Sequence, residues 1–210
     1  MHLIRSIHAV PGPAVISAYE AWWKERLAVL QTCPGFMDRE GNAGLWNSLA
    51  YPLHFLVVDA WESRTAVNAA IRGAYAEFVR RTPRPAGVTM VHPTEAWETL
   101  NTVTRDGSSV GPGSSDTYLR QVEWTVRLSA MTTFESSRAE FFPLLQRHAP
   151  EVRASVIYRS AGIAGRYRVV HRSTAMGGEI PAELRAWMLT HPSSDYADTA
   201  PVAELFMRAL

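Results

Sequence analysis

Acidic and basic side chains alternate with apolar ones along residues 119–128, LRQVEWTVRL. Side chains two positions apart share one face of an extended strand, so Glu123 and Arg127 point to the same side and Trp124 points to the other. If the polar side lines a cavity, Glu123 can accept a proton and Arg127 can hold an anion. If it faces water, the same row is the solvated side of an edge strand. Trp124 is a candidate for contact with a substrate ring.

The second half of the chain holds further side chains suited to proton transfer. Tyr158 and His171 fall on neighbouring predicted strands, and phenol and imidazole groups both serve as general acids or bases. Trp187 and His191 lie in or just after the last predicted helix, and Tyr196 follows shortly after. Aromatic rings suit the walls of a pocket for a planar ligand. We therefore expect Tyr158 and His171 to act in catalysis, and Trp187 and His191 to bind substrate.

The first half offers fewer candidates, and each has a structural alternative. His8 lies on a predicted strand and Asn47 follows Trp46 near the end of another. Both are candidate catalytic residues, although a hydrogen-bonded core histidine and a turn asparagine are the alternatives. Trp61 and Tyr75 are candidate substrate-binding residues; the alternatives are a packing residue of the core for Trp61 and an ordinary half-buried tyrosine for Tyr75.

The sequence predicts neither a metal site nor a cofactor. The seven histidines are scattered without ligand spacing, there is no Cys pair, and there is no His-Glu-x-x-His motif. The glycines of GSSVGPG lie in no strand-to-helix context, so they do not predict a phosphate loop. The single cysteine, Cys33, cannot form an internal disulfide, which favours a reducing compartment.

The composition excludes some classes of partner. Twenty-one Lys and Arg residues against twenty Asp and Glu leave a formal net charge of +1, too little for a surface that binds nucleic acid or an anionic membrane. No stretch approaches the roughly 20 apolar residues that span a bilayer, and MHLIRSIHAV does not resemble a signal peptide. We expect a cytoplasmic protein.

Apolar periodicity predicts the same element order twice. The first half reads as strand, helix, strand, strand, helix, strand at residues 3–10, 13–31, 36–48, 53–61, 64–80 and 86–99. The second half reads in the same order at residues 119–128, 136–148, 153–163, 166–174, 181–190 and 201–209, with both helices shorter. Between them, residues 102–117 are rich in Gly and Ser, as is typical of a linker.

The predicted fold class is α+β, with two tandem ferredoxin-like β-α-β-β-α-β units at residues 1–101 and 118–210. Helices cover one face of such a sheet, so the two remaining faces can pack together as an intramolecular α+β barrel. The strand FLVVDAW at residues 55–61 is apolar on both faces, which fits this arrangement. Ser63 is placed to cap the helix that follows.

The segments DAWESRTAVNAAIRGAYAEF and GFMDREGN in the first half resemble the antibiotic biosynthesis monooxygenase domains of the dimeric α+β barrel superfamily. The resemblance implies a homodimeric barrel fused into one chain, with a further homodimer possible. It also implies oxidation of aromatic, anthrone-like substrates by O₂ without a metal or flavin. The haem-degrading branch uses a Trp and a His in the second helix, where this chain has Ala70 and Arg80.

From this resemblance we expect a cofactor-independent monooxygenase, or a related ring-modifying enzyme, acting on an aromatic polyketide-like metabolite with O₂. A non-catalytic ligand-binding or accessory protein is the alternative, followed by a haem-binding or haem-degrading member. The second half lacks the Trp-Glu-Ser ending and carries more polar strand residues. We therefore expect the two halves to differ, with the working site in the second.

Overall fold

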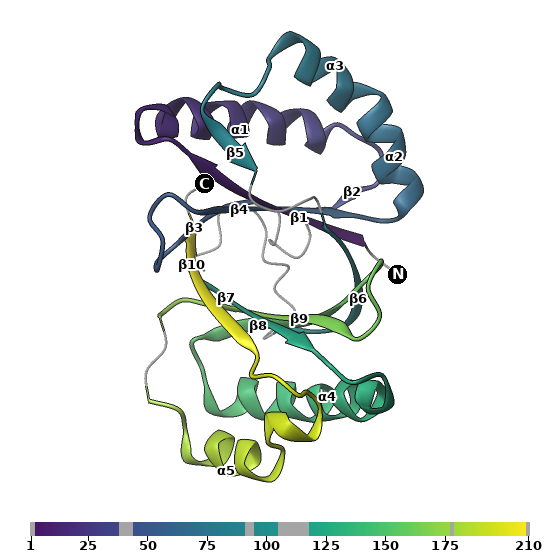
Figure 1. Ribbon diagram of the computed structural model, residues 1–210, viewed down its shortest axis with the longest axis vertical. Coiled ribbons are helices and arrows are strands. Elements are labelled where there is room, and N and C mark those ends of the chain that lie inside the picture. Colours follow the sequence, from purple (N-terminus) through teal and green to yellow (C-terminus); the bar gives the residue numbers. More distant parts are fainter. Residues whose placement is uncertain (1–2, 38–43, 91–94, 105–117, 177–178, 209–210) are drawn as a thin grey trace. The chain divides into compact units, whose positions relative to one another are not determined.

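The computed structural model describes residues 3–37, 44–90, 95–104, 118–176 and 179–208. The chain divides into two compact units (Figure 1). The first contains the described part of residues 3–96 together with 207–208, and the second contains 97–104 and 118–206. No helix in these ranges is long and apolar enough to cross a membrane.

The first unit follows the predicted order of elements. Its helices are the short 3-10 helix η1 (Pro13–Val15), α1 (Ile16–Gln31), α2 (Arg64–Arg72) and α3 (Ala74–Arg81). Its strands are β1 (Leu3–Pro11), β2 (Phe36–Met37), β3 (Gly44–Ser48), β4 (Phe55–Trp61) and β5 (Val88–Met90). The sheet runs β5-β1-β4, and β4 also pairs with β2 and β3; all these pairings are antiparallel.

All helices of this unit lie on one face of its sheet (Figure 1). The core between them contains Trp22 and Trp23 of α1, packed against Phe55 and Val57 of β4. Every residue of β4 is buried, as the two apolar faces of the sequence predict. Trp22 also ties α1 to the end of α3, because its Nε1 donates a hydrogen bond to the carbonyl of Thr82 at 2.8 Å.

Ser63 is the N-cap of α2, as predicted: its extended backbone lets Oγ accept a hydrogen bond from the amide of Ala66 at 3.1 Å. We expect Ser63→Ala to lower the free energy of unfolding by about 1 kcal/mol, because the amide loses its acceptor. Urea unfolding would measure this, with Thr65→Ala on the exposed side of the same helical turn as control. Equal stabilities for the two variants would contradict the capping role.

The second unit contains five strands and two main helices in the described residues. Its strands are β6 (Glu95–Thr104), β7 (Tyr118–Thr125), β8 (Val152–Ser160), β9 (Arg166–Ser173) and β10 (Val202–Arg208). Its helices are η2 (Leu128–Ala130), α4 (Met131–His148), α5 (Ala182–Thr190) and η3 (Ser193–Asp195). The strand order is β10-β7-β9-β8-β6, and α4 and α5 lie together on one face of this sheet (Figure 1).

Three details differ from the sequence prediction. The helix predicted over 64–80 is divided at Gly73, which ends α2 and precedes α3. The helix predicted to begin at 136 begins at Met131, so α4 is 18 residues long against 16 for α1 and is not the shorter of the two.

The third difference concerns the strand predicted over 86–99, which falls into two strands, β5 and β6. From Trp97 onward, β6 pairs with β8 and belongs to the second unit. It runs to Thr104, three residues into the segment predicted as a linker; residues 105–117 lie outside the described ranges.

Candidate functional site

In the first unit, the space between sheet and helices contains a closed ion cluster centred on Asp59. Its carboxylate accepts two hydrogen bonds from Arg5, both at 2.8 Å, and one from Arg26 at 2.7 Å. Trp61 Nε1 donates a fourth, at 2.6 Å. Burial raises the pKa of Asp59, but the two guanidinium groups outweigh it and bring the pKa down to about 2. Asp59 is therefore ionised and fully occupied by the protein itself.

Two of the predicted substrate-binding residues belong to this cluster. Trp61 is completely buried at the end of β4, where it orients Asp59 and packs edge-on against Phe36. Tyr75 of α3 lies with its ring 5.2 Å from the guanidinium of Arg26, within cation–π distance. Both side chains do lie between helices and sheet, and the contacts that they make are structural.

The equivalent space in the second unit is organised around His171 on β9. In the sheet His171 lies directly opposite Arg120 of β7 on one side and Ser155 of β8 on the other. Ser155 Oγ and His171 Nδ1 are 2.8 Å apart, so they share one hydrogen bond. Burial, together with the charges of Arg120 and Arg138, lowers the pKa of His171 to about 3. The imidazole is therefore neutral at pH 7.

Arg138 of α4 faces the same space and is only 7% exposed. Aromatic rings surround its guanidinium at centroid distances between 4.9 and 5.8 Å. They belong to Trp124, Phe134, Phe141, Trp187 and Tyr196. Burial lowers the pKa of Arg138 to about 10, so it keeps its charge at neutral pH. Among the described residues no carboxylate forms an ion pair with it. Its Nε donates a long hydrogen bond, 3.4 Å, to Ser137, and its guanidinium also forms a hydrogen bond with the neutral hydroxyl of Tyr196.

Trp187 and His191 extend this aromatic wall along α5. Their rings stack almost in parallel, with centroids 4.1 Å apart, and the ring of Phe141 lies 4.7 Å from Trp187. Both Trp187 and His191 keep part of their surface exposed. The predicted substrate-binding residues Trp124, Trp187 and His191 thus gather on the helix-covered side of the second sheet, together with His171.

Two other predicted catalytic residues, Glu123 and Tyr158, lie on the opposite face of that sheet. Glu123 accepts hydrogen bonds from Arg168 at 2.6 Å and Arg166 at 3.0 Å. Burial raises the pKa of Glu123, but the two arginines lower it by more, which makes the carboxylate a poor proton acceptor. Tyr158 pairs in register with Arg168. The structure therefore separates Tyr158 and Glu123 from His171.

Arg127 lies beyond the end of β7 and does not extend the polar row of the strand. Its guanidinium binds the carboxylate of Asp198 at 2.8 Å and the carbonyl oxygens of Ser194 and Asp195 at 3.0 and 2.7 Å. It thereby fixes the loop that carries Tyr196. This is a structural role.

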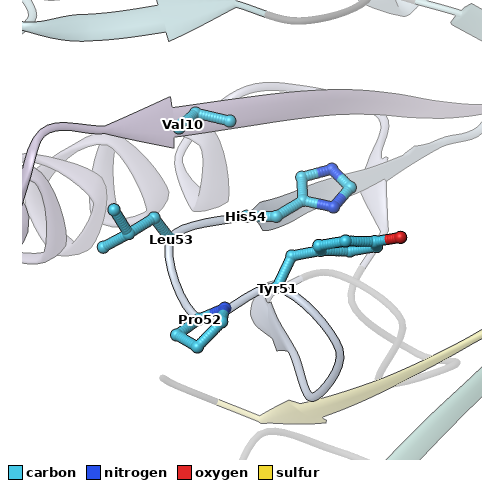
Figure 2. A pocket seen from close by; sticks show the side chains of 5 residues that line it. All are labelled: Val10, Tyr51, Pro52, Leu53 and His54. Atoms are coloured by element: carbon cyan, nitrogen blue, oxygen red, sulfur yellow. The ribbon is translucent and has the colours of Figure 1, made fainter.

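A separate hollow of about 400 Å³ lies in the first unit, where β1 ends and β4 begins. Val10, Pro52, Leu53, Tyr51 and His54 line it, all from the end of β1 and the turn before β4 (Figure 2).

His8 of β1 contacts His54: Nδ1 of His8 and Nε2 of His54 are 2.7 Å apart and share a hydrogen bond. Asn47 on β3 pairs in register with Phe55, and its buried Oδ1 accepts no hydrogen bond from the described residues. No three His, Cys, Asp or Glu side chains within the described ranges group as metal ligands.

Sequence reasoning missed Arg138 and Ser155. Arg138 lies in a predicted amphipathic helix, where an arginine ordinarily points to water. Phe134 and Phe141 are near it on α4, but its other three rings come from distant parts of the chain. Ser155 interrupts an apolar strand, RASVIY, and that was the available signal. The pairing of Asp59 with Arg26 was also missed, although an aspartate within a fully apolar strand predicts a buried partner.

The lowered pKa of His171 predicts a pH dependence of stability. The unfolded chain binds a proton at this residue below about pH 6.5 and the folded chain only below about pH 3, so stability is complete above the first value and falls between the two. Relative to His171→Asn, we expect the wild-type free energy of unfolding to drop by up to about 1.4 kcal/mol more per pH unit. Denaturant unfolding at pH 7, 6 and 5 would measure it. Parallel curves for the two proteins would contradict the buried neutral state.

Comparison with solved structures finds the same fold over the whole chain. A candidate monooxygenase from Fusobacterium nucleatum subsp. nucleatum ATCC 25586 has a TM-score of 0.75 at 6% identity, covering 99% of this chain and 93% of that one. A candidate monooxygenase from Lactobacillus acidophilus NCFM has a TM-score of 0.68 at 9% identity, covering 99% and 94%. An anthrone oxidase-like protein has a TM-score of 0.68 at 13% identity, covering 100% and 91%.

No protein-family model and no curated protein matches the sequence. At identities this low, structural likeness shows the fold and leaves the chemistry to the site. The predicted α+β class is confirmed, and the predicted resemblance is confirmed as a likeness of fold, which the chain shares with these monooxygenase-like structures.

Proposed function

We propose that the protein is a cofactor-independent monooxygenase, or a related ring-modifying enzyme, acting on an aromatic polyketide-like hydroxy compound. The observation that carries the proposal is the charged Arg138 held among five aromatic rings beside the neutral His171. Rings on several sides suit a planar substrate, and the guanidinium suits a developing negative charge. The site lies on the helix-covered side of the second unit.

Chemistry without a cofactor requires the substrate to supply the electrons. His171, positioned through Nδ1 by Ser155, accepts the proton of a phenol or enol, and Arg138 stabilises the resulting anion. The anion raises the pKa of the neighbouring imidazole, which favours this transfer. The electron-rich anion then donates an electron to O₂. For an anthrone-like CH₂ group, the complete reaction places one oxygen atom in a new carbonyl and the other in water, with four electrons leaving the carbon.

One observation favours a second candidate, a non-catalytic ligand-binding protein. A histidine with a pKa of about 3 is far from the neutral value that suits a general base. Such a protein would use Arg138 and the rings to bind the same class of molecule without reaction.

Oxygen consumption distinguishes the two candidates. Purified protein would be incubated with a panel of anthrones, naphthols and hydroxyquinones in an oxygen electrode, with binding of each compound measured in parallel by tryptophan fluorescence. Oxygen uptake with at least one compound, dependent on protein, is the result expected of the enzyme. Binding without uptake across the panel would favour the binding protein, and an absorbance spectrum would reveal bound haem.

A further inference from the structure

The two units place different residues at equivalent positions of their sheets. In the first, Arg5 lies opposite Asp59, and in the second, Arg120 lies opposite His171. Asp59 and His171 are each two residues before the end of their strands. Arg5 and Arg120 are each eight residues before the short 3-10 helix that follows their strands. His171 therefore stands where the first unit has the carboxylate of Asp59.

The helices that cover the two sheets, α1 and α4, each carry one aromatic residue and one arginine at equivalent positions, but in the opposite order along the helix. Counted from the start of the preceding 3-10 helix, Trp23 of α1 corresponds to Arg138 of α4, and Arg26 corresponds to Phe141. Each unit thus presents one arginine and one aromatic ring, three residues apart, toward its sheet. In both, the guanidinium lies over the ring, at 5.7 Å in the first unit and 5.5 Å in the second.

The charge balance of the two centres differs as a result. The first unit has two guanidinium groups and one carboxylate, joined by hydrogen bonds of 2.7 and 2.8 Å. The second has two guanidinium groups and a neutral imidazole. Aromatic faces attract the charge of Arg138, and the hydroxyl of Tyr196 forms a hydrogen bond with it, but neither brings a counter-charge. A single external negative charge would give the second centre the balance that Asp59 gives the first.

We propose that the second unit binds an aromatic anion, whose ionised oxygen supplies beside His171 and Arg138 the negative charge that the carboxylate of Asp59 supplies in the first unit. The inference rests on the proposed function for the location of the site and names the charge state of the ligand. Asp59 closes the first unit to such a ligand. Arg120 is exposed, and His171 and Trp187 are partly exposed, so the charged oxygen can approach from this side while the ring system packs along Trp187.

Binding of matched probes tests the proposal without requiring turnover. Naphthalene-2-carboxylate and its neutral counterpart naphthalene-2-carboxamide would be titrated by calorimetry against wild type, His171→Asp and His171→Asn. Wild type is expected to bind the carboxylate at least about tenfold more tightly than the carboxamide, since charge-assisted hydrogen bonds to Arg138 are lost in the neutral probe. A second pair, 4-nitrophenolate and 4-nitroanisole, distinguishes a phenolate oxygen from a carboxylate.

His171→Asp supplies the second unit with the carboxylate that the first unit has in Asp59. It should therefore bind the anion at least about tenfold more weakly than His171→Asn, whose side chain has the same size as that of aspartate but no charge. Circular dichroism would establish that both variants fold. Preference for either anion over its neutral counterpart, lost in His171→Asp, supports the proposal. Equal binding of charged and neutral probes by wild type, no binding of any probe, or equal anion affinities of the two variants would overturn it. If the anion site is overturned but oxygen uptake is observed, the proposed function still holds. If the anion binds as expected but no oxygen is consumed, the anion site holds and the proposed oxygenase function does not.

Discussion

Asp59→Asn is expected to lower the free energy of unfolding by about 3–5 kcal/mol, the typical cost of removing one partner from a buried ion pair. The substitution keeps the size of the side chain but leaves Arg5 and Arg26 with no counter-charge, and Arg26 is only 1% exposed. Unfolding in urea, monitored by tryptophan fluorescence, would measure the change.

The matched control for this variant is Glu77→Gln. Glu77 pairs with Arg80 and Arg81 on the exposed surface of α3, where solvent screens such pairs and they contribute little to stability. The same loss of one negative charge should therefore cost several times less there. If the two variants were equally stable, the cluster at Asp59 could not be the buried anchor of the first unit.

Arg138→Gln is expected to reduce kcat/KM for an oxidised hydroxyaromatic substrate by about 10²–10³-fold, the range found when a donor to a developing anion is removed. The glutamine keeps polar atoms in the site but removes the charge. Arg185→Gln is the matched control, because Arg185 lies exposed on α5 and pairs only with the exposed Glu179 among described acidic residues.

Oxygen uptake at several substrate concentrations would separate kcat from KM in these variants. A decrease mainly in kcat indicates that Arg138 stabilises the transition state more than the bound substrate. An increase mainly in KM indicates that it binds the substrate and the transition state equally. Arg138→Lys retains a charge without the planar guanidinium, so it should recover part of the lost activity. Activity of Arg138→Gln within threefold of the control would exclude Arg138 from the site.

Much of the fold follows from local sequence patterns. Apolar residues at helical and strand spacing predicted the order of elements in each unit, and Ser63 predicted the start of α2. The pairing of β6 with β8 could not be predicted in this way, because the residues of a strand fix which faces are buried but not which neighbour it joins. For the same reason, local patterns do not indicate that the chain passes from the first compact unit to the second within β6, after Ala96.

The candidate site was less predictable than the fold. Alternation along β7 correctly placed Glu123 and Trp124 on opposite faces, but it could not indicate that helices cover the face with Trp124. The polar row therefore drew attention to Glu123 and Arg127, whereas the uncompensated charge belongs to Arg138. Its setting depends on rings from β7, α4, α5 and the segment after α5, and such a convergence is visible only in three dimensions.

The stoichiometry of anion binding tests the central claim most directly. If the second unit holds the ligand site and Asp59 closes the equivalent place in the first, calorimetry with naphthalene-2-carboxylate should give one equivalent per chain for wild type and no measurable binding for Arg138→Gln. Two equivalents per chain, or one equivalent that persists in Arg138→Gln, would contradict the account.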